Sequence, residues 1–178
     1  MSVLAQIHFA ASERELKFLL IGGFAVNAHG FSRVTGDLDL AVSRPDRTGW
    51  HDLITALGYQ VAAENERFLQ FQSVAEGSLP IDVMLANRPT FERFWQQAIE
   101  TQIGGLIYRV VSLEHLIAMK LHVLKQAKLH RYMKDYQDVV SLVLVNRINL
   151  GEENYRTLFE KYGTLKLYEK IRRSCGDE

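Results

Sequence analysis

The sequence predicts an α/β (α+β) protein: a short mixed β-sheet flanked by helices, followed by a C-terminal helical region. Up to Val111, short apolar or alternating segments typical of strands are interleaved with amphipathic segments. Beyond Val111, the apolar patterns have helical spacing. The length of 178 residues fits one domain with a small helical extension. We therefore expect a core over residues 1–111 and a helical region over residues 112–178 packed on it as one compact unit.

The individual elements follow from short-range patterns. Strands are expected where apolar or alternating residues form short runs bounded by turn residues, at residues 18–21, 37–42, 59–62, 68–74, 80–85 and 106–111. Helices are expected where apolar residues recur every three or four positions, at residues 3–17, 24–29, 46–57, 91–99, 113–124, 134–147, 152–162 and 165–173. Ser112 is a suitable N-cap for the first helix of the C-terminal region.

Composition excludes several classes of function. Lys plus Arg number 21 and Asp plus Glu number 21, so the whole chain does not attract nucleic acids or acidic membranes by net charge. One cysteine, Cys175, excludes a disulfide framework and a Cys-based zinc site. Apolar runs are too short to span a membrane, and the first residues lack the cationic region of a signal peptide. We therefore expect a cytoplasmic protein without a membrane partner.

Two aspartates two positions apart form the most informative pattern. Asp37 and Asp39 lie in an expected strand, where alternate side chains share a face, so both carboxylates point the same way. The two negatively charged carboxylates repel each other, and a bound Mg²⁺ or Mn²⁺ would remove that repulsion. Asp82 interrupts another apolar strand. If the two strands are neighbours, three carboxylates can hold metal for phosphoryl transfer, and Asp82 can accept a proton.

A glycine pair, Gly22 and Gly23, separates an expected strand from a short helix. Glycine lets the backbone come close to a phosphate, although most glycine pairs are simply turns. The acids also have a plain alternative, in which Asp37 and Asp39 cap a strand at the surface and Asp82 pairs with an arginine. The glycine pair and the three acids together favour the phosphate-and-metal interpretation.

The stretch from Gly22 to Leu40 strongly resembles the signature of the nucleotidyltransferase (polymerase-β-like) superfamily. That signature is a Gly-Gly or Gly-Ser turn, a short helix, and Asp-x-Asp on the next strand. This version is similar to the AbiEii/AbiGii branch, whose toxins are nucleotidyltransferases. The resemblance continues through Asp82 and residues 112–121 to residues 131–138. It implies a nucleotidyltransferase-type sheet, Mg²⁺, and an NTP such as ATP as the donor.

The resemblance also implies roles for individual residues. The catalytic metal carboxylates are matched by Asp37, Asp39 and Asp82, and the phosphate-side turn by Gly22 and Gly23. The later stretches of the family are matched by Lys120, Lys134 and Asp135. At position 23 many members have a serine whose hydroxyl contacts phosphate, and this chain has glycine.

Several charged residues have two interpretations from the sequence alone. Lys120 lies on an apolar helix stripe and either reaches water or meets an anion, for which we expect phosphate. Asp135 either positions Lys120 or Arg131, or caps its helix. Arg33 either neutralises phosphate or pairs with an acid of the site. The basic stretch Lys125–Arg131 either binds triphosphate or nucleic acid, or is a solvated connector.

The expected function is transfer of NMP from an NTP to an acceptor hydroxyl on tRNA or on a protein. The setting implied by the resemblance is a toxin–antitoxin or phage-defence system, with a cognate antitoxin or toxin as partner. Two alternatives stay open. One is an antitoxin-like protein that AMPylates its partner toxin, and the other is a nucleotide-binding module without turnover.

Overall fold

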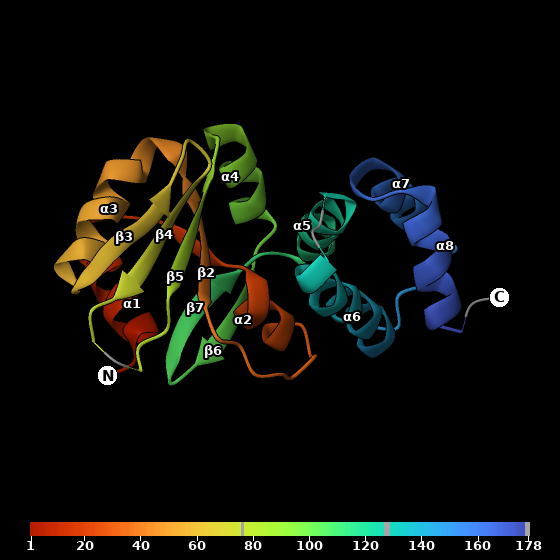
Figure 1. Ribbon diagram of the computed structural model, residues 1–178, viewed down its shortest axis with the longest axis horizontal. Coiled ribbons are helices and arrows are strands. Elements are labelled where there is room, and N and C mark those ends of the chain that lie inside the picture. Colours follow the sequence, from red (N-terminus) through yellow and green to blue (C-terminus); the bar gives the residue numbers. More distant parts are fainter. Residues whose placement is uncertain (76, 127–128, 177–178) are drawn as a thin grey trace. The chain divides into compact units, whose positions relative to one another are not determined.

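The computed structural model describes residues 1–75, 77–126 and 129–176, without the side chains of residues 129–131. The chain forms two compact units. The first consists of Met1–Ala25 and Arg33–Ser112, and the second of Val26–Ser32 and Leu113–Glu178. Figure 1 shows the sheet of the first unit and the helices of the second.

The first unit is built on a seven-stranded mixed sheet of order β3-β4-β5-β2-β1-β7-β6. The strands are β1 Phe18–Leu20, β2 Leu38–Ser43, β3 Tyr59–Glu64, β4 Phe68–Ser73, β5 Ile81–Ala86, β6 Ile99–Ile103 and β7 Leu106–Val110. Strand β2 is antiparallel to β1 and parallel to β5, while β1 is parallel to β7. The expected short mixed sheet flanked by helices is therefore confirmed.

The helices of this unit are α1 Val3–Glu13, α3 Arg47–Ala56 with the 3-10 turn Arg44–Asp46 before it, α4 Arg88–Gln96, and the start of α2 Gly22–Ala28. Helix α1 packs on α3, and α4 packs on β2. Caps set two of the starts: Ser2 Oγ accepts a hydrogen bond from Ala5 N, and Asn87 Oδ1 accepts one from Thr90 N.

One face of β2 lies in the core. Leu38 and Leu40 are fully buried, and the register places Val42 opposite Phe18 of β1 on the same face. The Phe18 ring contacts Trp50 of α3 with centroids 5.6 Å apart. This face is thus covered by α3, and strand alternation turns the next residues of β2 to the other face. Asp39 therefore faces away from the Leu38–Leu40 side of the sheet.

The expected helix over residues 91–99 is wrong at both ends. Helix α4 begins at Arg88 and ends at Gln96, and residue 99 instead begins β6. Strand β6 pairs antiparallel with β7 through a hairpin whose central residues, Gly104 and Gly105, have φ of 57° and 85°. A two-residue hairpin turn of type I′ requires positive φ at both central residues, and glycine adopts positive φ without strain. The Gly-Gly pair just before the apolar run of β7 is the sequence signal for the missed strand β6.

The second unit is helical in its described residues, as expected. Its helices are α5 Leu113–Gln126, α6 Leu129–Val145, α7 Glu153–Tyr162 and α8 Leu165–Ser174. Helix α6 begins five residues earlier than predicted, and α5 packs on α6 and α7. Asn146 Nδ2 donates to the His29 carbonyl at 2.9 Å, which ties residues 26–32 to α6. Among the described residues, no helix combines the length and apolar character needed to cross a lipid bilayer.

Candidate functional site

Three carboxylates meet where β2 and β5 begin. The two strands are parallel neighbours, and their register pairs Asp39 with Asp82. Asp37 lies in the bend one residue before β2. One carboxylate oxygen from each of the three residues lies within 4.8 Å of the other two, and all three side chains are half-buried. The predicted convergence of these side chains is confirmed as geometry.

The arrangement fits a small divalent cation. Mg²⁺ takes oxygen ligands at about 2.1 Å in an octahedron, so neighbouring oxygens are about 3 Å apart and opposite oxygens about 4 Å apart. Carboxylate oxygens within 4.8 Å of one another reach these spacings by small side-chain rotations. The described site could therefore hold Mg²⁺ or Mn²⁺ and leave further positions for water and phosphate.

Gly22 closes one side of this cluster. Its φ is +57°, and a Cβ on it would lie 1.8 Å from Oδ2 of Asp39. The amide of Ile21 donates to the Asp39 carbonyl at 3.1 Å, which holds the end of β1 against β2. Glycine at position 22 is therefore required by the close approach of an acidic side chain, in addition to its left-handed backbone.

Thr35 lies between the second glycine and the first acid. A Cβ on Gly23 would meet Thr35 Oγ1 at 2.2 Å and Thr35 Cβ at 2.7 Å. The same hydroxyl donates to Oδ1 of Asp37 at 3.0 Å and approaches the Asp37 carbonyl at 3.2 Å. Arg33 is nearby, with Nη1 3.4 Å from the same Cβ position and 3.1 Å from the Val34 carbonyl. Sequence reasoning missed Thr35, although it stands two residues before Asp37.

Gln70 contacts the third acid. Strand β4 is antiparallel to β5, and the register places Gln70 opposite Asp82. Its Nε2 donates to Oδ1 of Asp82 at 3.2 Å. Gln70 alternates with the buried residues Leu69 and Phe71, so its side chain is on the face of the acids. Sequence reasoning also missed this residue, because a glutamine in an alternating strand carries no signal of its own.

The basic residues expected to bind nucleotide include members of the second unit. Lys120 is buried, and its Nζ lies 2.8 Å from Oδ1 of Asp135 and 2.6 Å from Oδ2 of Asp138. Asp135 therefore makes the contact with Lys120 that a positioning role requires, and Asp138 adds a second carboxylate to the same ammonium group. Lys134 is exposed. Of the basic stretch, Lys128 and the side chains of residues 129–131 lie outside the described residues.

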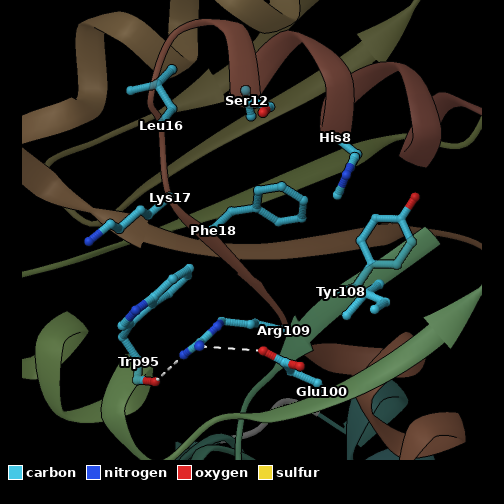
Figure 2. A pocket seen from close by; sticks show the side chains of 11 residues that line it. His8, Ser12, Leu16, Lys17, Phe18, Trp95, Glu100, Tyr108 and Arg109 are labelled. Atoms are coloured by element: carbon cyan, nitrogen blue, oxygen red, sulfur yellow. Dashed lines mark hydrogen bonds and ion pairs between the residues drawn. The ribbon is translucent and has the colours of Figure 1, made fainter.

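Figure 2 shows the side chains that line a cavity of about 230 Å³. Phe18, the first residue of β1, lines this cavity, whereas Ile21, just beyond the last residue of β1, contacts Asp39. The cavity wall includes Tyr108, whose burial raises its pKa, and Trp95, whose ring centroid is 5.3 Å from Lys17 Nζ and 4.5 Å from Arg109 Cζ. Arg109 also donates to the Trp95 carbonyl at 3.2 Å and lies 3.4 Å from a Glu100 oxygen. The one acid of the lining is thus paired with arginine, and the cavity has no cluster of acids for a cation.

The mixed sheet and the three converging carboxylates are consistent with a nucleotidyltransferase, and a match to a family model shows that class. A family model described as "Nucleotidyl transferase AbiEii toxin, Type IV TA system" matches residues 2–174. The chain therefore belongs to the AbiEii nucleotidyltransferase family. A search of curated proteins gives no significant match.

Solved structures of nucleotidyltransferases share the fold. The crystal structure of ANT(2'')-Ia with adenylyl-2''-tobramycin has a TM-score of 0.67 at 20% identity, covering 90% of this chain and 94% of that chain. A nucleotidyltransferase-like protein from Paracoccidioides brasiliensis has a TM-score of 0.58 at 12% identity, covering 98% and 92%. The lincosamide adenylyltransferase LnuA with bound lincomycin has a TM-score of 0.58 at 15% identity, covering 78% and 95%.

Proposed function

We propose that this protein is a metal-dependent nucleotidyltransferase that moves NMP from an NTP to an acceptor hydroxyl on tRNA or on a protein. The observation that carries the proposal is the approach of the Asp37, Asp39 and Asp82 carboxylates to within 4.8 Å. Membership in the AbiEii family supports nucleotidyl transfer, and the family description, which names a type IV toxin–antitoxin system, supports a toxin–antitoxin setting. NTP and Mg²⁺ are abundant in the cytoplasm, which is where we expect the reaction.

The proposed chemistry is an in-line displacement. A divalent cation held by Asp37, Asp39 and Asp82 would neutralise the charge on the transferring phosphate. Asp82 accepts the proton of the acceptor hydroxyl, and the hydroxyl oxygen forms a bond to the α-phosphorus of the NTP. The bond from the α-phosphorus to its bridging oxygen breaks, and pyrophosphate leaves.

Nucleotide-binding roles are part of the same proposal. Gly22 and Gly23 would bring backbone close to the NTP phosphates, and Arg33 would neutralise their charge. Lys134 and Lys120 would do the same, with Asp135 positioning Lys120. Lys120 has three N–H donors, of which two account for its contacts with Asp135 and Asp138.

Label transfer tests the proposal directly. The wild-type protein is incubated with each α-phosphate-labelled NTP, Mg²⁺, and either total RNA or cell lysate, and labelled products are separated by electrophoresis. We expect label on one class of acceptor. Asp39→Asn should abolish transfer, because it removes a carboxylate of the cluster, whereas Asp52→Asn makes the same chemical change at an exposed position on α3 and should not.

The outcomes separate the alternatives. Label on a single protein in lysate favours the antitoxin-like AMPylator, and NTP binding without transfer to any acceptor favours a module without turnover. Tobramycin, whose adenylyl derivative is named for one similar structure, and lincomycin, which is named for another, serve as small-molecule acceptors in a further arm. Equal transfer by wild type and Asp39→Asn would overturn the proposed site.

A further inference from the structure

We propose that Thr35 and Gln70 are positioning residues of the cation site, which orient Asp37 and Asp82 through neutral hydrogen bonds. The inference rests on the proposed function, because it concerns the same three carboxylates. The two donors belong to different segments: Thr35 lies in the chain that leads into β2, and Gln70 lies on β4. They contact the two acids of the cluster that do not lie against Gly22.

The position of Thr35 is set by the backbone beneath it. Its side chain occupies the space that a Cβ at residue 23 would need, with Oγ1 only 2.2 Å from that point. Glycine at position 23 therefore makes room for a hydroxyl supplied from position 35. From this position the hydroxyl donates to Oδ1 of Asp37 at 3.0 Å. Rotation of the Asp37 carboxylate away from the cluster would break that bond.

The position of Gln70 is set by the sheet. Its neighbours Leu69 and Phe71 are buried on the other face and anchor β4. The β4–β5 register holds Gln70 opposite Asp82, so its amide reaches Oδ1 at 3.2 Å. Asp37 is thus held by a side chain two residues before it, Asp82 is held by a side chain of the neighbouring strand, and both donors are themselves fixed by packing.

The neutral character of both donors is what suits them to this task. A lysine or arginine on the same carboxylates would cancel the charge that attracts a divalent cation. A hydroxyl or an amide orients the carboxylate and leaves its full negative charge in place. Each bond also uses only one of the roughly four lone-pair sites of its carboxylate, so the acid can still bind a cation.

The inference is tested by measuring the affinity of the full chain for Mn²⁺, in the wild-type protein and in single-residue variants. Free Mn²⁺ is followed by electron paramagnetic resonance during titration, and thermal unfolding without metal is recorded in parallel. Thr35→Val and Gln70→Met keep side-chain size but remove the donors. Mutation of a residue that hydrogen-bonds to a metal ligand typically lowers metal affinity by about 10–100-fold. We therefore expect each variant to bind Mn²⁺ about tenfold more weakly or worse.

Two matched variants separate positioning from folding. Thr35→Ser keeps the hydroxyl and should restore affinity. Gln72→Met makes the same change two residues along β4, at an exposed residue that pairs with Gln60, and should bind Mn²⁺ like wild type. The inference is overturned if Thr35→Val and Gln70→Met bind Mn²⁺ as tightly as wild type, or if Thr35→Ser is as weak as Thr35→Val.

The two proposals fail in different ways. Wild-type affinity in both donor variants, together with active wild-type enzyme, overturns the positioning role alone. Weakened Mn²⁺ binding in both variants, without nucleotidyl transfer by wild type, supports positioning and overturns the proposed function alone. Failure of the wild-type protein to bind Mn²⁺ overturns both.

Discussion

The carboxylate of Asp39 lies against the α-carbon of Gly22, so closely that a Cβ on that glycine would be 1.8 Å from Oδ2. Gly22 is the first residue of α2, and Asp39 is a residue of β2. Any side chain at position 22 would overlap this carboxylate and displace it from its position in the cluster. The glycine therefore protects the geometry of the acid cluster.

Gly22→Ala should damage the cation site and the fold together. The alanine must adopt a φ of +57°, which costs on the order of 1–3 kcal/mol, and must also displace Asp39. We expect a lower free energy of unfolding by urea titration and loss of nucleotidyl transfer. Gly36→Ala is the control, because no atom outside the adjacent residues lies within 4 Å of a Cβ there. Equal effects of both substitutions would contradict the contact with Asp39.

Gly23→Ala should be rescued by a second substitution. The added Cβ would lie 2.2 Å and 2.7 Å from the Oγ1 and Cβ of Thr35, so one of the two side chains must move. We expect Gly23→Ala to lower the unfolding temperature and Gly23→Ala/Thr35→Gly to recover part of the loss. Gly23→Ala/Thr35→Ser should not recover it, because serine keeps both clashing atoms. A purely additive double variant would rule out this contact as the cause.

Lys120→Met should destabilise the second unit strongly. The lysine side chain is 8% exposed and its partner Asp138 1%, so removal of the ammonium leaves two carboxylates together with little water. Breaking a buried ion pair in this way typically costs about 3–5 kcal/mol. Urea unfolding followed by circular dichroism measures the change. Lys125→Met, at an exposed position of the same helix, should change stability little, and Lys120→Met/Asp138→Asn should recover part of the loss.

Stability at alkaline pH should depend on Tyr108. Burial raises its pKa above the ordinary value of 10.0, so the folded state holds the phenolic proton more tightly than the unfolded state. The stabilisation of the folded state that comes from holding this proton is complete below about pH 10 and is lost as pH rises through the raised pKa. Tyr108→Phe removes that loss. Urea midpoints from about pH 8 to about pH 11 should therefore fall less steeply for the variant than for wild type. Parallel curves would contradict the shift.

Much of the sheet could be predicted because its signals are local. Strand β2 and strand β5 have alternating or apolar patterns that are visible within six residues, and the expected ranges differ from the observed ones by one residue at each end. Strand β6 was missed because its residues Ile99–Ile103 lie mostly on the surface and lack a buried stripe. The early start of α6 was missed because a basic, polar first turn resembles a connector.

The sequence by itself determined which acids could form a site, because Asp37, Asp39 and Asp82 interrupt patterns that are otherwise apolar. It also carried the family signature. The tertiary structure alone decided that Asp39 stands opposite Asp82, because strand order and register depend on contacts between segments more than forty residues apart. Only the structure revealed Thr35 against Gly23 and Gln70 against Asp82, although each pair is separated by just twelve residues. A single packing contact or hydrogen bond between two segments leaves no periodic trace in the chain.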